Sequence, residues 1–300
     1  MPKLNCNRRT FLHRGSCYLL AAGAGLASSG KLLAAETSAK PAVRFGMMTD
    51  MHHSDKKMRI NRYYRKTLEK LQVAAVELKK AKPAFVVELG DFIDKAKEVE
   101  VELGYLKRIH QDFDKLPGEK HYVLGNHCID TLTKEEFLGV VGQEKSYYSF
   151  DEGGVHFVVL DSCFLKDGTP YGRNNSRWND ANFPQEELDW LAKDLKQTKN
   201  KAIIFVHQRL DTEDGYSVNN ADAARKVLED AGNVLAVFQG HSHKNKHNMI
   251  NGIHYCVHRA MVEGGEEGDN GFSTLDVFAD GTIKLTGFFD QKNYEWQAKA

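Results

Sequence analysis

Side chains that bind metal ions recur at the ends of short apolar runs in this chain. Asp50 and His52 follow the run 43–49, and Asp91 follows the run 84–89. Five segments in all have this arrangement: Asp50 and His52, Gly90-Asp91, Gly125-Asn126-His127, His207, and Gly240-His241-Ser242-His243. Because aspartate, asparagine and histidine offer hard oxygen and borderline nitrogen ligands, the set favours manganese, iron or zinc over calcium or magnesium. Cysteine is not in the set, which argues against a structural zinc site.

The number of candidate ligands is enough for two metal ions. Asp50 and His52 are two residues apart, as are His241 and His243, and at the end of a strand this spacing can place both side chains around one ion. Two ions roughly 3.5–4 Å apart would stabilise both the entering and the leaving oxygen of a phosphoryl displacement. The chemistry indicated is metal-assisted hydrolysis.

The apolar runs predict the elements that bring these segments together. A run such as 84–89 is typical of a buried parallel strand, and ligands of open α/β sheets gather beyond the carboxyl ends of such strands. Strands are expected over 43–49, 84–89, 121–124, 146–150, 155–160, 201–206 and 234–239. Helices are expected over 61–80, 98–114, 185–196 and 221–231.

The last part of the chain has a different pattern. Asn251-Gly252 and Asp280-Gly281 each separate two apolar runs, which predicts antiparallel hairpins. The predicted hairpins pair 247–250 with 253–257 and 272–278 with 283–289. Segment 162–183 is the longest irregular stretch, and loops of that length are often functional.

Length and composition are those of an ordinary soluble enzyme. With 300 residues and 41% hydrophobic content, the chain can bury a sizeable core. One domain over 42–290 is the simplest organisation, because no repeat or low-complexity linker interrupts it. Basic and acidic residues number 41 each, so the net charge gives no indication of nucleic acid or an anionic membrane as partner.

The amino terminus is typical of an export signal. Arg8 and Arg9 precede a weakly apolar stretch over 18–26, and Ala34-Ala35 offers a small-residue cleavage site. Residues 1–35 thus resemble a twin-arginine signal, which the export machinery reads. We therefore expect a periplasmic or secreted product. The alternative is a basic amino-terminal helix that is never cleaved.

Cysteine usage indicates no disulfide framework. Cys6 and Cys17 fall within the expected signal, which leaves the odd set Cys128, Cys163 and Cys256. Cys128 and Cys163 both follow predicted strands, and whether they pair is left open.

In their order, the five segments resemble the pattern of the calcineurin-like metallophosphoesterases. That pattern runs through an Asp-x-His, a Gly-Asp-x-x-Asp, a Gly-Asn-His, a lone His after a strand and a Gly-His-x-His. The second element here extends from Gly90 to Asp94, and the resemblance covers residues 42–260. It implies a four-layer α/β/β/α sandwich, in which two mixed sheets pack face to face and helices cover the outsides.

The resemblance also implies roles for the candidate residues. Two overlapping sets would hold two divalent or mixed-valence ions of manganese, iron or zinc: Asp50, His52, Asp91 and His243 for one, and Asp91, Asn126, His207 and His241 for the other. Asp91 would bridge the two ions. His127 would contact the phosphoryl oxygens or protonate the leaving group, and a hydroxide between the metals would attack phosphorus.

Two departures from related patterns matter. The family commonly follows Asn-His with an acidic residue that orients the histidine, whereas this chain has Cys128, so His127 must find another partner. Asp94 is expected to support its loop. The purple acid phosphatases have a tyrosine where Asp94 stands and a glycine where His52 stands, so the chain looks unlike them.

The expected function is that of a phosphomonoesterase, similar to an alkaline phosphatase, that acts on a phosphorylated small molecule. A phosphodiesterase or diphosphatase for nucleotide-like substrates is the alternative, since the same metal centre serves both. A binding protein without activity is a further alternative. Arg173 and Arg177 lie in the long irregular stretch and are candidates for contacting substrate phosphate. The sequence gives no indication of the oligomeric state.

Overall fold

The computed structural model describes residues 40–265 and 268–297. The expected export signal lies outside the described residues, as do Cys6 and Cys17, and its role stays a prediction. The described chain forms two six-stranded sheets. The first has the order β12 (Tyr294–Trp296), β11 (Ile283–Phe289), β10 (Gly271–Val277), β1 (Val43–Met48), β2 (Phe85–Glu88) and β3 (Glu119–Tyr122). The second has the order β4 (Tyr148–Glu152), β5 (Val155–Val159), β6 (Lys201–Phe205), β7 (Val234–Gln239), β9 (Ile253–Val257) and β8 (Lys246–Ile250).

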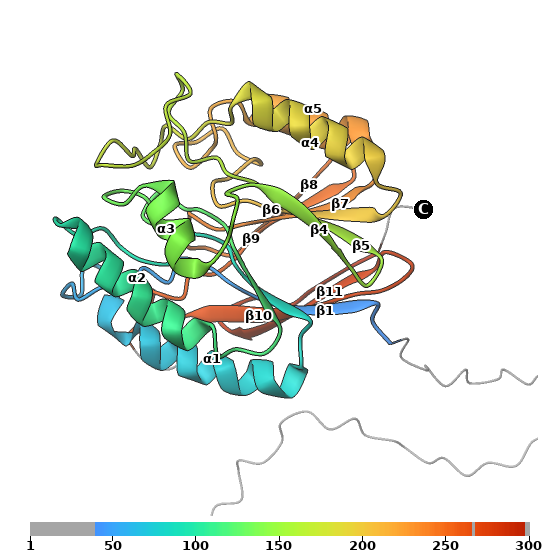
Figure 1. Ribbon diagram of the computed structural model, residues 1–300. Coiled ribbons are helices and arrows are strands. Elements are labelled where there is room, and N and C mark those ends of the chain that lie inside the picture. The colour runs from blue at the N-terminus through green and yellow to red at the C-terminus, as the bar shows by residue number, and fades with distance from the viewer. Residues whose placement is uncertain (1–39, 266–267, 298–300) are drawn as a thin grey trace, which may run out of the picture. The chain divides into compact units, whose positions relative to one another are not determined.

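Both sheets are mixed, and helices cover their outer faces. In the first sheet β1, β2 and β3 run parallel, whereas β10, β11 and β12 pair antiparallel. In the second sheet β5, β6, β7 and β9 are parallel, with antiparallel strands at both edges. Helices α1 (Thr67–Ala81) and α2 (Val99–Phe113) lie against the first sheet, and α4 (Gln185–Gln197) and α5 (Ala221–Ala231) against the second (Figure 1). The expected four-layer sandwich is confirmed.

The core between the two sheets is largely aromatic. Phe45 of β1 stacks on Phe85 of β2, with ring centroids 4.8 Å apart and planes at 7°. From the opposite sheet, Phe157 and Phe205 approach the Phe45 ring edge-on at 5.5 and 5.7 Å. Burial of each such ring stabilises the fold by about 1.5–3 kcal/mol. This contact fixes the two sheets face to face, so that the ends of their strands form one common edge.

That common edge carries the predicted metal ligands. The parallel strands β1, β2 and β3 of one sheet and β6 and β7 of the other end there in short loops. These loops hold the seven predicted ligands, each within a few residues of the end of its strand: Asp50, His52, Asp91, Asn126, His207, His241 and His243.

Most predicted elements exist, and the differences have local causes. The helix expected over 61–80 begins only at Thr67, after the short 3-10 helix Tyr64–Lys66. The residues before it pair with other backbone instead, because Arg62 forms bridges with Arg59 and Glu263 and the Tyr63 amide donates to the Val262 carbonyl. Helix α3 (Lys134–Val141) was not predicted, although Thr133 and Glu136 form a capping box at its start. Strand β12 was not predicted either.

The predicted hairpins are confirmed. Strand β8 pairs antiparallel with β9, and β10 with β11. Asn251 and Gly252 both have positive φ, 50° and 85°, as a tight two-residue hairpin turn requires.

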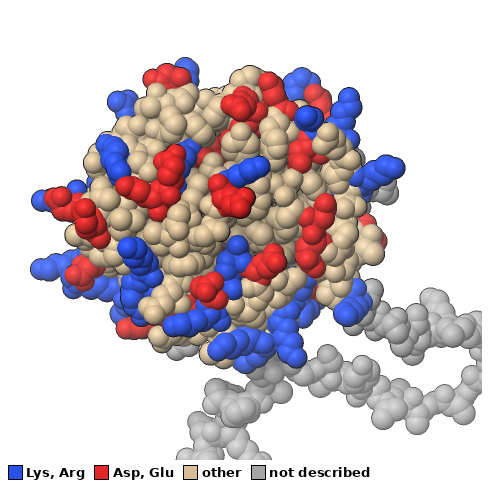
Figure 2. Space-filling model, in the orientation of Figure 1, with Lys and Arg blue, Asp and Glu red and all other residues tan. Residues whose placement is uncertain are grey.

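Charges are distributed without a dominant sign. Figure 2 shows basic and acidic side chains interspersed over one face of the molecule. Among the residues that the structure describes, no helix combines the length and apolar character needed to cross a membrane.

Candidate metal centre

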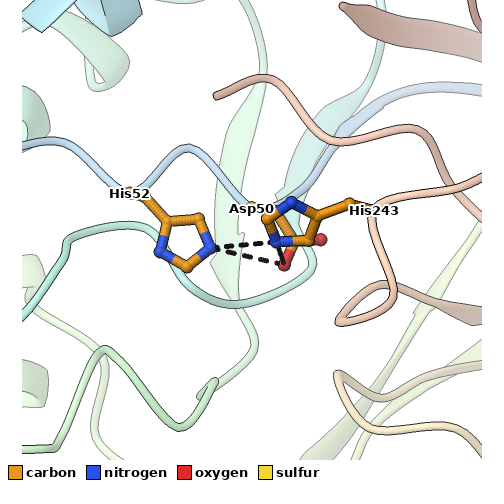
Figure 3. A group of neighbouring side chains, drawn as sticks. All are labelled: Asp50, His52 and His243. Carbon is orange, nitrogen blue, oxygen red and sulfur yellow. Dashed lines mark hydrogen bonds and ion pairs between the residues drawn. The ribbon is translucent and has the colours of Figure 1, made fainter. Parts of the chain in front are cut away.

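The predicted ligands converge in space from segments far apart in the chain. Three overlapping groups bring ligand atoms within 4.8 Å of one another: Asp50, His52 and His243; His52, Asp91 and His127; and Asp91, His207 and His241. Figure 3 shows the first group, in which the two imidazole rings converge on one carboxylate. The convergence expected from the strand ends is therefore observed.

The first group surrounds one oxygen of Asp50. Its Oδ1 lies 3.2 Å from His243 Nε2 and 3.7 Å from His52 Nε2, and these two nitrogens are 3.2 Å apart. The other oxygen, Oδ2, accepts hydrogen bonds from Thr49 Oγ1 and the His241 amide. Because Oδ2 is held by the protein, Oδ1 remains for a cation.

Asp91 joins the first group, through His52, to the group of Asp91, His207 and His241. Its Oδ2 lies 3.5 Å from His52 Nε2 and 3.2 Å from His207 Nε2, so one oxygen borders both groups. Its Oδ1 accepts a hydrogen bond from the amide of His127 at 2.8 Å. This is the position that a bridging carboxylate requires.

The histidines of the centre are oriented through their second ring nitrogens. His207 Nδ1 lies 2.8 Å from the Leu89 carbonyl, His241 Nε2 lies 2.9 Å from the Trp178 carbonyl, and His243 Nδ1 lies 2.7 Å from Glu263 Oε1. Imidazoles that bind metals commonly donate the other N–H to such acceptors, which fixes the tautomer and the ring plane. The nitrogens left free are the ones that face the cluster.

Buried polar atoms at the centre lack partners within the described chain. Asp50 Oδ1, Asn126 Oδ1 and His207 Nε2 are buried and make no hydrogen bond there. An unpaired buried polar atom costs free energy, and a bound cation would supply the missing interaction to all three. On this evidence the residues fit a metal centre.

Protonation states differ among the candidate ligands. Burial lowers the pKa of His52 to about 4, and burial together with the charge of His207 lowers that of His241 to about 3. Burial raises the pKa of Asp91, but the charges of His207 and His127 outweigh it and hold that pKa well below its usual range. Burial likewise lowers the pKa of His207, but the Asp91 carboxylate outweighs it and raises the value to about 9. A metal must therefore displace a proton from His207.

The backbone at the centre is strained. Five of the candidate residues have a positive φ between 45° and 67°: Asp50, His52, Asp91, His241 and His243. Such conformations are uncommon in residues other than glycine, and they occur at functional sites where the surrounding structure enforces them.

Glycines of the motifs make room for the ligands of neighbouring loops. A Cβ on Gly125 would overlap the amide nitrogen and Oδ1 of Asp91, and a Cβ on Gly240 would overlap Thr49 Oγ1. A Cβ on Gly90 would meet the His207 ring. Each of these glycines therefore leaves space for a side chain of another loop at the centre.

His127 has an acidic partner after all. Its Nδ1 lies 2.6 Å from Asp94 Oδ1, while Asp94 Oδ2 pairs with Lys56 Nζ at 3.2 Å. Asp94 therefore orients His127, the role that the family gives to an acidic residue at the position of Cys128 here. This role goes beyond the loop support that was expected of Asp94. The His127 side chain is 23% exposed and its ring centroid lies 4.7 Å from that of His52, so it faces both the centre and the exterior.

Sequence reasoning missed the residues behind His243. Glu263 holds its Nδ1, and the loop of Glu263 is held in turn by the buried Lys70 of α1, whose ammonium donates to the carbonyls of Met261, Val262, Glu263 and Gly264. In addition, the amide of Val262 donates to the Asp50 carbonyl. Lys70 lies about 190 residues from this loop in the chain, and no spacing signal connects them.

The remaining predicted residues have other surroundings. Arg173 pairs with Glu136 of α3 at 2.5 Å and also donates to the Thr131 carbonyl. Arg177 is followed by Trp178, which lies beside His241. Contact of either arginine with substrate stays a prediction.

The cysteines form no disulfide within the described part of the chain, where Cys128, Cys163 and Cys256 are buried thiols. Cys128 Sγ accepts a hydrogen bond from the Phe92 amide, and Cys163 Sγ donates to the Leu124 carbonyl. Their surroundings are those of core residues.

The fold and this centre are those of a metallophosphoesterase. The family model of the calcineurin-like phosphoesterases matches residues 43–245, and the chain belongs to this family. The resemblance predicted from the motifs is thereby confirmed, and the protein is a hydrolase of that class.

Similar proteins have more specific names. A manganese-dependent ADP-ribose/CDP-alcohol diphosphatase from Oryza sativa subsp. japonica is 24% identical, over 81% of this chain and 91% of that protein. The serine/threonine-protein phosphatase CPPED1 of Homo sapiens is 30% identical, over 63% of this chain and 62% of that protein. The crystal structure of a dimetal phosphatase from Danio rerio has a TM-score of 0.76 at 19% identity, covering 87% of this chain and all of that one, which shows a common fold.

Replacing Gly125 with alanine tests the packing role of the motif glycines. Gly125→Ala is expected to lower the manganese affinity of the protein about 10- to 100-fold, because the new Cβ displaces Asp91. Gly139→Ala is the control: Gly139 lies within α3 with open space around its Cβ position, so that variant should bind manganese normally and gain about 0.5–1 kcal/mol of stability. Calorimetric titration with Mn²⁺ measures the affinity of both variants, and denaturant unfolding measures the stability of Gly139→Ala. Normal affinity in Gly125→Ala would contradict the assignment.

Replacing Lys70 with methionine tests the support of His243. Lys70→Met is expected to weaken manganese binding roughly 10-fold or more, because the loop that carries Glu263 loses the hydrogen bonds from the Lys70 ammonium, and Glu263 then holds His243 less firmly. Lys79→Met, at an exposed position of the same helix, should leave the affinity unchanged. If Lys70→Met lowers only the melting temperature and retains full metal affinity, Lys70 stabilises the fold and has no part in the centre.

Proposed function

We propose that this protein is a manganese-dependent diphosphatase that hydrolyses the diphosphate bond of small nucleotide-like substrates. The similarity to proteins named for ADP-ribose and CDP-alcohol substrates, over four-fifths of the chain, supports this choice. It favours the diphosphatase alternative over the phosphomonoesterase that was first expected. The complete and converging ligand set is the observation that carries the catalytic part of the proposal.

Each predicted ligand has a position that suits its proposed role. Asp50, His52 and His243 would hold one metal, and His207, His241 and Asn126 would hold the other. Asp91 would bridge them, because its Oδ2 borders both groups. When bound, two such ions supply an activated water and neutralise the charge of the phosphoryl oxygens.

His127 is proposed as the residue that contacts the phosphoryl or leaving oxygen. Its amide holds Asp91, its Nδ1 is held by Asp94, and its side chain remains partly exposed, at 23%, beside the centre. An imidazole oriented in this way can donate a proton from Nε2. A positioned acid of this kind contributes about 10²–10⁴-fold to a rate.

A substrate comparison tests the proposed function. With Mn²⁺ present, ADP-ribose and CDP-choline should be hydrolysed with a kcat/KM at least about tenfold above that for p-nitrophenyl phosphate, because the parts of the substrate beyond the attacked phosphate add binding energy that the small monoester lacks. Asp91→Asn serves as the inactive control, with its fold checked by circular dichroism. A preference for the monoester would contradict the proposal and favour a phosphomonoesterase function. Turnover of phosphopeptides in place of either would point to a protein phosphatase.

The pH profile tests the pairing of Asp94 with His127. Burial lowers the pKa of His127, but the charge of Asp91 and the hydrogen bond to Asp94 outweigh it, so the net pKa is raised. The protonated, acid-competent ring therefore persists to higher pH. Asp94→Asn removes one of these carboxylates, so the alkaline limb of kcat should move to lower pH and its maximum should fall about 10²-fold.

Asp112→Asn, at the α2 surface, is the matched control and should leave the profile in place. An alkaline limb that does not move in Asp94→Asn would show that another group sets it.

A further inference from the structure

Two aromatic side chains, Trp178 and Tyr216, lie beside the group of Asp91, His207 and His241. Trp178 is 50% exposed and Tyr216 is 39% exposed, and their ring centroids lie 5.3 Å apart. Both rings lie beside His241, the Tyr216 ring at 5.4 Å and the Trp178 ring at 6.3 Å between centroids. We call Trp178 and Tyr216 the aromatic pair. Large aromatic surfaces left open to water beside a site of chemistry are available for a ligand.

The aromatic pair is held in place by the loops that carry it. The Trp178 carbonyl accepts a hydrogen bond from His241, and its indole packs over Gly215, where a Cβ would lie 3.2 Å from the ring. The backbone of Tyr216 is held by two hydrogen bonds, since its amide donates to Asp214 and its carbonyl accepts from the Arg209 amide. The loops that carry both rings are therefore held before any ligand arrives and the rings pack on each other, which lowers the entropic cost of stacking on them.

The surroundings of the aromatic pair disfavour an anionic occupant. Beside it lies a cavity of about 230 Å³ with Asn179, Glu213, Asp214 and Asp222 in its lining. The one arginine of that lining, Arg225, is paired with Asp222 and with the Leu210 carbonyl. A second phosphate or a carboxylate would meet mainly negative charge here, whereas a neutral planar ring would not.

We propose that Trp178 and Tyr216 form the subsite for the nucleobase of the substrate, one sugar unit away from the phosphates at the metal centre. The inference rests on the proposed diphosphatase function, which it deepens by assigning the base-recognising residues. Stacking tolerates different bases, because each presents a planar face. A subsite built in this way would accept both purine and pyrimidine diphosphates.

Paired substrates separate base recognition from catalysis. ADP-ribose is compared with a diphosphate that carries a ribose on each phosphate and no base. Trp178→Ala and Tyr216→Ala keep the backbone contacts of both loops, including the carbonyl that holds His241. Each should raise KM for ADP-ribose about 5- to 100-fold and leave the base-free substrate unchanged. Tyr216→Phe retains the ring and should behave as the native protein.

The control outcomes are decisive. Equal losses on both substrates would mean that the aromatic pair only positions His241, and no loss on either would mean that the rings do not touch the base. Both results overturn the inference. Trp190→Ala, whose ring packs on Tyr147 elsewhere, is the matched control and should change neither KM.

A binding measurement without turnover keeps this inference distinct from the proposed function. Titration with AMP should quench the tryptophan fluorescence of the native protein, and Trp178→Phe should remove that quenching while Trp190→Phe retains it. If the native protein hydrolyses no diphosphate, the proposed function fails, yet quenching that depends on Trp178 would still support a base subsite. No quenching at millimolar AMP, or quenching by a phosphopeptide and not by AMP, would overturn the assignment of a base subsite.

Discussion

Asp91 Oδ2 lies between His52 Nε2 and His207 Nε2 in a position where the carboxylate is almost fully excluded from water. Asp50 is equally buried, and its Oδ1 lies 3.7 Å from the same His52 nitrogen. Two ionised carboxylates so close together in a dry interior would be very costly without nearby positive charge. The imidazoles supply part of that charge, and their free nitrogens point to where cations would supply the rest. The arrangement of the surrounding loops follows from this requirement.

Holding those charges together costs conformational freedom at several levels. The ligand residues adopt left-handed backbone conformations, the motif glycines leave space for ligands on adjacent loops, and hydrogen bonds from Thr49 and His127 fix the carboxylate oxygens that face away from the centre. The two sheets make this possible. Their aromatic contact around Phe45 aligns five strand ends, so that short loops suffice to bring the ligands together.

Much of this could be predicted from the chain alone, because strand ends and short motifs are local signals. Asp50, Asp91 and His207 each follow a buried apolar run, and their convergence follows from parallel-strand geometry. Contacts between distant segments leave no such signal. Lys70 on α1 clamps the loop of Glu263, and Asp94 takes the place of the missing acidic neighbour of His127. The ion pair of Arg173 with Glu136 is another contact between distant segments, and contact of Arg173 with substrate phosphate stays a prediction.

Local signals were also misjudged in two places. The helical pattern that begins near Asn61 continues into α1, but the pairing of Arg62 and Tyr63 with backbone at 262–263 delays the start to Thr67. The capping box at Thr133 is a sequence signal for the start of α3. The helix was missed because its eight residues are too few to show a clear helical periodicity. Neither error affected the predicted ligands, because each ligand follows the end of a strand and not of a helix.

The number and positions of the bound metals test the central claim most directly. Crystals of the protein soaked in Mn²⁺ and measured at the manganese absorption edge would show each ion by its anomalous scattering. The structure predicts two peaks, one among Asp50, His52, Asp91 and His243 and one among Asp91, Asn126, His207 and His241, with Asp91 between them. A single peak, or peaks away from these residues, would contradict the dinuclear centre and with it the proposed hydrolysis.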